Sequence, residues 1–226
     1  MTHYRYGILF SVFAGLAFWR ACSTVFPVAC VLLIWLWLSC ICVAAAFFGH
    51  QPKWLMGKKQ NGGASPFHCL LNAPFLLAYW FTWLIRHFVL RHEPVNTVAG
   101  TNVSISCWPG FHVPLDRYDL IIDVTSEMPK WYRCPNTQYA CLPNLDGVPL
   151  DRYELPIAID RDMRILVHCA QGRGRSALMT CLILLKLGHA ETPEEAFHKL
   201  KQSRPGVALS RAQYWQLVQF ANFLAD

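Results

Sequence analysis

Residues 164–176 read Arg-Ile-Leu-Val-His-Cys-Ala-Gln-Gly-Arg-Gly-Arg-Ser. The first four residues have the pattern of a short buried strand, and residues 176–187, which follow the stretch, are apolar nearly all round, as in a buried helix. A loop that contains two glycines joins them. The order strand, loop, helix predicts that this loop lies at the carboxyl end of a strand and at the amino end of a helix.

Such a loop is suited to bind an anion. Tight turns at Gly172 and Gly174 can point successive backbone N–H groups inward, and the following helix adds the positive end of its dipole. The guanidinium of Arg175 matches two phosphate oxygens at once. The candidate binding residues are therefore His168, Ala170, Gln171, Gly172, Arg173 and Gly174.

The same loop carries a candidate nucleophile. An electropositive cradle stabilises the thiolate of Cys169, which could then attack phosphorus. Ser176 is placed to hydrogen-bond the sulfur when it becomes a leaving group, and His168 is placed to hold the loop through its ring nitrogens. The competing interpretation is a buried structural cysteine at a strand end, which does not require the surrounding His, Gly, Arg and Ser.

The residues around the loop predict an α/β domain. Four segments have strand patterns: Thr101 to Cys107, Leu120 to Val124, Tyr139 to Leu142 and Arg164 to Val167. Thr192 is a predicted N-cap followed by Pro193, and Ser210 with Gln213 forms a predicted capping box. Strands that feed helices imply a mostly parallel central sheet flanked by helices.

The charge distribution divides the chain in two. Residues 1–92 contain seven Lys or Arg and no Asp or Glu, whereas residues 93–226 contain 13 basic and 14 acidic residues. The net charge of +6 therefore marks a cation-flanked apolar segment and does not indicate nucleic-acid binding. We expect residues 1–92 to be a membrane anchor and residues 93–226 to be a catalytic domain that holds every catalytic residue and works without the anchor.

Two apolar stretches predict membrane spans. The 24 uncharged residues Val25 to Phe48 can cross a bilayer core, and Tyr6 to Trp19 reads as the first arm of a hairpin that breaks near Pro27. A cleaved signal peptide is the alternative, but the apolar block is long and lacks an evident cleavage site.

A third apolar stretch, Phe67 to Leu90, fits either a third span or a helix in the membrane interface. With two spans and an interfacial helix, the loop of Lys53, Lys58 and Lys59 and the catalytic domain share the cytoplasmic face. We favour that topology. The ten cysteines show no zinc-ligand spacing, and a thiolate enzyme needs a reducing compartment, which also favours the cytoplasm.

The pattern of His168, Cys169, Arg175 and Ser176 resembles the signature of the protein-tyrosine and dual-specificity phosphatase superfamily, His-Cys-x5-Arg-Ser/Thr. The resemblance extends from about Tyr118 to Phe220 and is nearest to small dual-specificity enzymes similar to phosphatidylglycerophosphate phosphatases. It implies a dual-specificity-phosphatase-like fold and hydrolysis of phosphomonoesters through a phosphocysteine intermediate. The membrane anchor, residues 1–92, has no counterpart in these enzymes.

The resemblance also implies a general acid on a movable loop. Asp146 lies in Leu142-Pro143-Asn144-Leu145-Asp146-Gly147-Val148-Pro149, where that acid is expected, although it is nearer to Cys169 than is usual in the superfamily. Asp151 is the fallback acid. Asp123 and Glu127 are expected to orient loops and to take no part in the chemistry.

The expected activity is that of a phosphatase at the membrane face, acting on a phosphoprotein or a phospholipid. Arg173 is either a solvated cation or attracts substrates that carry extra negative charge. A sulfurtransferase also uses a cysteine loop but needs no Asp146 or Ser176, and an inactive phosphate-binding module would not need the full set of catalytic residues. We expect no cofactor, metal or nucleic-acid partner.

Overall fold

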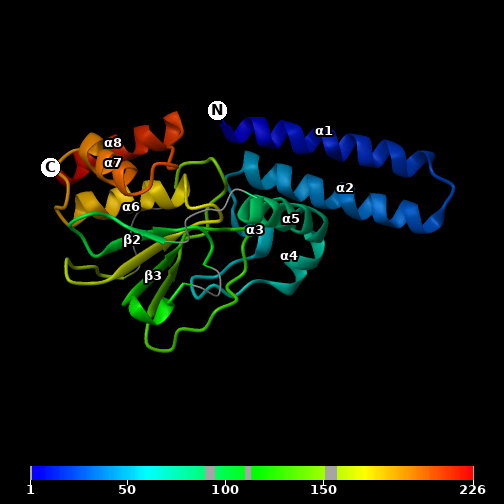
Figure 1. Ribbon diagram of the computed structural model, residues 1–226. Coiled ribbons are helices and arrows are strands. Elements are labelled where there is room, and N and C mark those ends of the chain that lie inside the picture. Colours follow the sequence, from blue (N-terminus) through cyan, green and yellow to red (C-terminus); the bar gives the residue numbers. More distant parts are fainter. Residues whose placement is uncertain (1, 90–94, 110–112, 151–156, 226) are drawn as a thin grey trace.

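The computed structural model describes residues 2–89, 95–109, 113–150 and 157–225. Two long helices, α1 (Thr2–Ser23) and α2 (Pro27–Phe48), form an antiparallel hairpin that projects from the rest of the molecule (Figure 1). Pro27 occupies the first turn of α2, where its missing N–H costs no hydrogen bond. The hairpin break therefore falls where the sequence predicts it.

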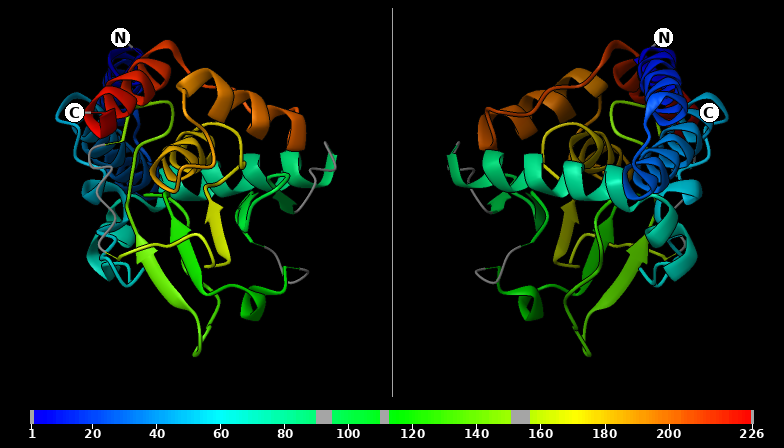
Figure 2. Two further views of the ribbon diagram at one scale, coloured as in Figure 1. Left: turned by 90° about the vertical axis from the view of Figure 1, so that its left-hand side faces the viewer. Right: turned by 90° about the vertical axis from the view of Figure 1, so that its right-hand side faces the viewer.

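Three shorter helices connect the hairpin to a sheet: α3 (Lys53–Met56), α4 (Pro66–Leu71) and α5 (Ala73–Val89). Asn72 separates α4 from α5, and its side-chain amide donates to the carbonyl oxygens of Trp54 at 2.8 Å and Leu55 at 2.9 Å. α5 runs across the direction of the hairpin, as the turned views show (Figure 2). α5 is therefore not a third arm that runs beside α1 and α2.

The sheet has five strands in the order β1-β2-β5-β3-β4. Their bounds are Val95–Thr97, Val103–Ser106, Ile165–His168, Leu120–Asp123 and Gln138–Cys141, in that spatial order. Only the β1–β2 pairing is antiparallel. The mostly parallel sheet is as predicted, and the four predicted strands lie within two residues of their expected bounds. The short polar β1 was not predicted.

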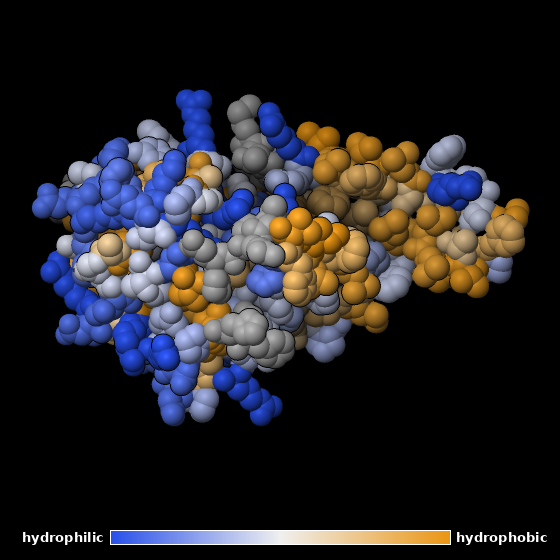
Figure 3. Space-filling model, viewed as in Figure 1, coloured by the Kyte–Doolittle hydropathy of each residue, from blue (hydrophilic) through white to orange (hydrophobic). Residues whose placement is uncertain are grey.

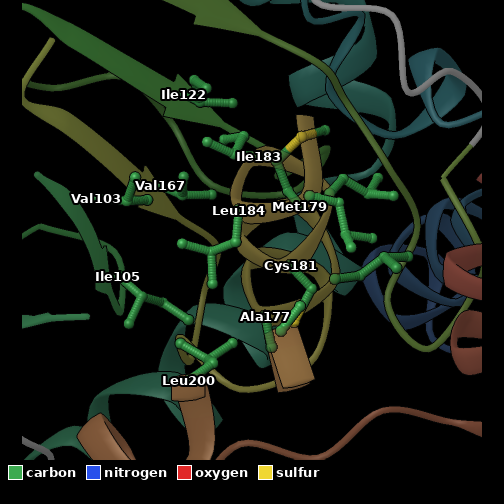
Figure 4. Close-up of a cluster of buried hydrophobic side chains, with 14 of the residues drawn as sticks. Val103, Ile105, Ile122, Val167, Ala177, Met179, Cys181, Ile183, Leu184 and Leu200 are labelled. Atoms are coloured by element: carbon green, nitrogen blue, oxygen red, sulfur yellow. The ribbon is translucent and has the colours of Figure 1, made fainter. Parts of the chain in front are cut away.

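The helices α6 (Arg175–Lys186), α7 (Pro193–Ser203) and α8 (Arg211–Ala225) lie together on one face of the sheet (Figure 1). Side chains of β2, β3 and β5 meet those of α6 in the main core, where Ile122 and Val167 face Met179 and Leu184 (Figure 4). The alternate residues Ile121 and Leu166 point to the other face, which loops cover with Val113, Leu115 and Tyr132. A 3-10 turn, Leu115–Arg117, belongs to this cover.

The predicted helix caps are confirmed. Thr192 Oγ1 accepts the backbone N–H of Glu195 at 3.2 Å, and Pro193 follows it in the first turn of α7. Ser210 and Gln213 bond reciprocally: the Ser210 N–H donates to Gln213 Oε1 at 3.0 Å, and the Gln213 N–H donates to Ser210 Oγ at 3.2 Å. These caps fix where α7 and α8 begin. They therefore also help to position the two helices that pack against α6.

The surface of the hairpin is strongly hydrophobic, whereas the surface of the α/β domain is mostly hydrophilic (Figure 3). Within the described residues, two helical segments are long and apolar enough to cross a membrane: Tyr4–Ser23 of α1 and Pro27–Phe48 of α2. Only 22% of each apolar window is buried. This exposure distinguishes the two helices from core helices of a soluble protein.

Candidate active site

The candidate nucleophile lies between β5 and α6. β5 ends at His168 and α6 begins at Arg175, so the loop between them stands at the carboxyl end of the central strand. Cys169 Sγ accepts the backbone N–H of Gly172 at 3.2 Å and lies 3.2 Å from Ser176 Oγ. The thiol is thus placed among hydrogen-bond donors that stabilise a negatively charged sulfur.

Gly172 is required by the shape of the loop. Its φ is +67°, and a Cβ there would stand 2.6 Å from the backbone of Ser106 and Cys107 at the end of β2. Arg204, which is nearly buried, donates from Nε to the Gly172 carbonyl at 2.8 Å. The Ala208 N–H donates to the Arg173 carbonyl at 3.0 Å. The loop is therefore held from both sides.

Arg175 is buried and faces Glu127. Nη1 lies 2.8 Å from Glu127 Oε2 and Nη2 lies 2.5 Å from Glu127 Oε1, while Nη1 also donates to the Asn144 carbonyl at 2.8 Å. Burial alone would raise the pKa of Glu127, but the charge of Arg175 holds that pKa below its ordinary value. Nε makes no hydrogen bond among the described residues but lies 3.3 Å from the carboxylate of Asp146.

His168 links the loop to a buried polar cluster beneath it. Its Nε2 lies 2.8 Å from the hydroxyl of Tyr132, and its Nδ1 is 4.0 Å from Asp123 Oδ1. Burial lowers the pKa of His168 to about 4, so the ring is neutral at physiological pH. Asp123 in turn accepts hydrogen bonds from Lys58 Nζ at 2.6 Å and Tyr139 Oη at 2.7 Å.

Lys58 was expected among the cations of a membrane-facing loop, and that expectation is wrong. Lys58 is 1% exposed and bonds Asp123 together with the hydroxyl and carbonyl oxygens of Thr125. Burial alone would raise the pKa of Asp123, but Lys58 brings it well below the usual range. Lys53 and Lys59 remain exposed.

The candidate general acid lies near the candidate phosphate-binding residue Arg175. Asp146 Oδ1 is 3.3 Å from Arg175 Nε, and its side chain is 51% exposed. The loop that carries it turns at Gly147, whose φ is +70°. Asp151, the fallback acid, lies outside the described residues. Arg173 is exposed on the outer side of the loop, with Gly174 behind it at the start of α6.

Helix α5 packs against the candidate active site. Trp83 Nε1 donates to the Ala170 carbonyl at 2.7 Å, and Arg86 Nη1 donates to Gln171 Oε1 at 3.0 Å. Trp80 Nε1 donates to the Glu127 carbonyl at 2.8 Å. Tyr79 Oη lies 3.5 Å from Arg175 Nη2. These contacts cross the predicted boundary at residue 92, so the catalytic loop does not stand independently of the first ninety residues.

The loop of Asp146 also contacts the hairpin. Leu145 and Val148, which flank Asp146 and Gly147, are buried in a cluster with Val43, Phe47 and Leu55, and Phe10 and Phe75 pack against this cluster. The hairpin base is therefore part of the support of the loop that carries the candidate acid.

Sequence reasoning missed the roles of Lys58, Tyr79, Trp80 and Trp83. The tryptophans of an apolar helix are equally typical of a membrane interface, and nothing in the local pattern of Lys58 marks it as buried. One signal was available: Asp123 ends the strand next to β5 and Glu127 follows that strand, and two acids expected to be buried there need basic partners. Their expected orienting role agrees with the bonds that they make.

Part of the chain is similar to known phosphatases. Residues 155–223 match the family model of the dual specificity phosphatase catalytic domain. No curated protein matched the chain. The crystal structure of human DUSP28 is 18% identical, with a TM-score of 0.47, and the alignment covers 60% of this chain and 97% of that chain.

Two further solved structures are similar to the same part of the chain. PTPMT1 in complex with PI(5)P is 17% identical, with a TM-score of 0.45 and coverage of 59% of this chain and 97% of that chain. A mouse putative dual specificity phosphatase complexed with zinc tungstate is 21% identical, with a TM-score of 0.45 and coverage of 59% and 89%.

The family match includes the Cys169 loop, α6, α7 and most of α8, and it defines the class of this protein: a cysteine-based phosphatase that acts on a phosphorylated substrate. Residues 155–223 thus match a dual specificity phosphatase catalytic domain, and two apolar helices lie ahead of it in the chain.

Proposed function

We propose that this protein hydrolyses phosphomonoesters of phosphoproteins or phospholipids at the cytoplasmic face of a membrane, through a phosphocysteine intermediate on Cys169. The observation that carries the proposal is the position of Cys169 Sγ, 3.2 Å from both the Gly172 N–H and Ser176 Oγ, in a loop that ends at the buried Arg175. Those groups stabilise a thiolate and bind a phosphate dianion in the same place.

In the first step the Cys169 thiolate attacks phosphorus, an S–P bond forms, and the P–O bond to the leaving group breaks. Asp146 gives its proton to the leaving oxygen, and the hydroxyl of Ser176 remains hydrogen-bonded to the sulfur. In the second step water attacks phosphorus, the S–P bond breaks, and the Asp146 carboxylate takes the proton of the water. The products are inorganic phosphate and the regenerated thiolate.

Arg175 and the loop have a binding role in this scheme. The backbone N–H groups of residues 170–174 surround the phosphate, and Arg175 Nε adds a charge-assisted bond when a phosphate oxygen replaces the Asp146 carboxylate that lies 3.3 Å from it. The hydrogen bonds of Glu127 fix the guanidinium plane, so little conformational entropy is lost when phosphate binds. His168, neutral and bonded to Tyr132, holds the loop from below.

The membrane location rests on the exposed apolar helices. α1 and α2 present a hydrophobic surface over their length (Figure 3). α5 adds the exposed side chains of Phe81 and Phe88. A helix with this character, lying across a hairpin that spans the bilayer, belongs at the interface. The exposed Lys53 and Lys59 support a cytoplasmic location for the same side, by the positive-inside rule.

The test of this function uses the detergent-solubilised protein and p-nitrophenyl phosphate. Cys169→Ser should abolish turnover and acid-stable labelling by phosphate, while tungstate still binds, because the loop and Arg175 survive. Cys22→Ser, a change of an exposed thiol near the end of α1, is the matched control and should leave turnover within about twofold. Residual turnover above about one per cent in Cys169→Ser would overturn the covalent mechanism.

A further inference from the structure

An apolar groove of about 500 Å³ lies between α1, α2 and α5. Its walls are hydrophobic side chains of all three helices, among them Phe13, Leu16, Leu36 and Ala78. It follows α1 from Phe10 to Arg20, a distance of about 15 Å at 1.5 Å per residue. The groove is therefore long, narrow and apolar, and it runs along the hairpin away from the α/β domain.

The inner end of the groove lies next to the candidate active site, with Tyr79 between them. Tyr79 lines the groove, and its hydroxyl lies 3.5 Å from Arg175 Nη2. Phe75, one helical turn earlier, packs on Tyr79 with ring centroids 6.0 Å apart. Phe75 and Phe10, both groove residues, also pack against the cluster that contains Leu145, the neighbour of Asp146. The same side chains thus border both the groove and the catalytic loops.

We infer that this groove receives an acyl chain of the substrate, and that the substrate is therefore a lipid phosphomonoester. The inference rests on the proposed function. A phosphate held by Arg175 at the membrane face leaves the hydrophobic part of the same molecule near the end of the groove that Tyr79 lines. Burial of a hydrocarbon chain there removes apolar surface from water and from the headgroup region.

A phosphoprotein substrate would not occupy this groove. The groove continues between two helices of the hairpin, and a folded protein at the cytoplasmic face cannot enter it. A chain of a non-substrate membrane lipid could occupy it, but such a lipid would make turnover independent of the chain length of the substrate. Chain-length dependence therefore separates the substrate from the bulk lipid.

The experiment uses full-length protein in mixed micelles of a nonionic detergent. The probes are a long-chain phosphatidic acid, a short-chain phosphatidic acid and p-nitrophenyl phosphate. Ala78→Trp on α5 and Leu16→Trp on α1 each narrow the groove. Leu77→Trp and Leu9→Trp are the matched controls, because they place the same ring on exposed positions of the same helices outside the groove.

Both groove variants should lower kcat/KM for the long-chain lipid about tenfold, the loss expected when about two methylene groups are kept out of apolar contact. The rate on p-nitrophenyl phosphate should stay within about twofold of the unmodified protein, and the controls should match that protein on every substrate. Selective loss in both groove variants supports the inference.

Equal long-chain rates in groove and control variants overturn the inference, and so does an unmodified enzyme that prefers phosphotyrosine peptides and shows no preference for long over short chains. In both cases hydrolysis of p-nitrophenyl phosphate would continue, and the proposed phosphatase function would stand. Absence of any hydrolysis by the unmodified protein would instead contradict the proposed function itself.

Discussion

Trp83 Nε1 donates a hydrogen bond to the carbonyl oxygen of Ala170 at 2.7 Å, so a helix from the first ninety residues touches the residue that follows Cys169. The same carbonyl accepts the backbone N–H of Trp108 at 3.1 Å, and the Trp83 and Trp108 rings meet edge to face. The loop is held between α5 and the end of β2. In this protein the catalytic loop is part of a structure that includes the apolar segment.

Trp83→Phe should weaken this support without removing the ring. We expect a loss of about 1 kcal/mol in the free energy of unfolding, since Ala170 keeps one of two donors. The kcat on p-nitrophenyl phosphate should fall several-fold as the loop loosens. Phe81→Leu, on the exposed side of α5, is the control and should change neither quantity. An unchanged kcat in Trp83→Phe would mean that the hydrogen bond does not position the loop.

Lys58→Met should be far more damaging than its neighbour Lys59→Met. Removal of the Lys58 ammonium leaves the buried Asp123 carboxylate without its cation, which costs about 3–5 kcal/mol. Lys59 is exposed, and its replacement should cost less than about 0.5 kcal/mol. Thermal unfolding of the two variants in the same detergent measures the difference. Similar unfolding temperatures would contradict the structural role assigned to Lys58.

Much of the fold followed from local patterns. The apolar runs of β3 and β5, the caps at Thr192 and Ser210, and the loop from Cys169 to Ser176 each carry their signal within a few residues. The docking of α5 carries no such signal, because Trp80 and Trp83 satisfy the pattern of an interfacial helix equally well. Lys58 and Asp123 are 65 residues apart, so their pairing depends on tertiary structure alone.

Acidification should destabilise the protein through His168. Burial lowers its folded pKa to about 4 from an ordinary value of 6.5, so the unfolded chain takes up the proton first. Stability from this group is complete above pH 6.5 and is lost as pH falls toward 4, by on the order of 3 kcal/mol. Asp123, whose pKa is lowered below its ordinary value, adds its own loss at lower pH.

The contribution of His168 can be isolated from the slope of the free energy of unfolding against pH. Between pH 6.5 and about 4, His168→Gln should show a shallower fall in the free energy of unfolding, by up to about 1.4 kcal/mol per pH unit. Denaturant titrations across this range give the slope directly. The exposed His198→Gln should keep the slope of the unmodified protein. Identical slopes in all three proteins would show that His168 titrates normally.

The role of Asp146 can be tested by the leaving group. Asp146→Asn should slow alkyl phosphates far more than aryl phosphates of low leaving-group pKa, because only a poor leaving group needs the proton. Loss of a general acid costs about 100-fold or more on the alkyl substrate. Asp160→Asn, an exposed acid ahead of β5, serves as the control. Equal slowing of both substrate classes would remove Asp146 from that role, and the same pattern in Asp151→Asn would transfer the role to Asp151.

Truncation should distinguish an anchor from a structural part of the enzyme. Residues 93–226 contain Cys169, Arg175 and Asp146, but they lack Lys58 and α5, so we expect this fragment to be unstable and at least tenfold less active on p-nitrophenyl phosphate.

Residues 50–226 keep both features and lose only the hairpin, whose Val43 and Phe47 cover Leu145 and Val148 beside Asp146. This longer fragment should retain the nucleophilic step and show a defect mainly with alkyl phosphates, because the loop of the general acid loses its support. Steady-state rates on aryl and alkyl phosphates, with circular dichroism as a check of folding, compare the two fragments. Full activity of residues 93–226 on both substrates would show that the contacts of Lys58, α5 and the hairpin are dispensable, and that residues 1–92 serve only to tether the enzyme.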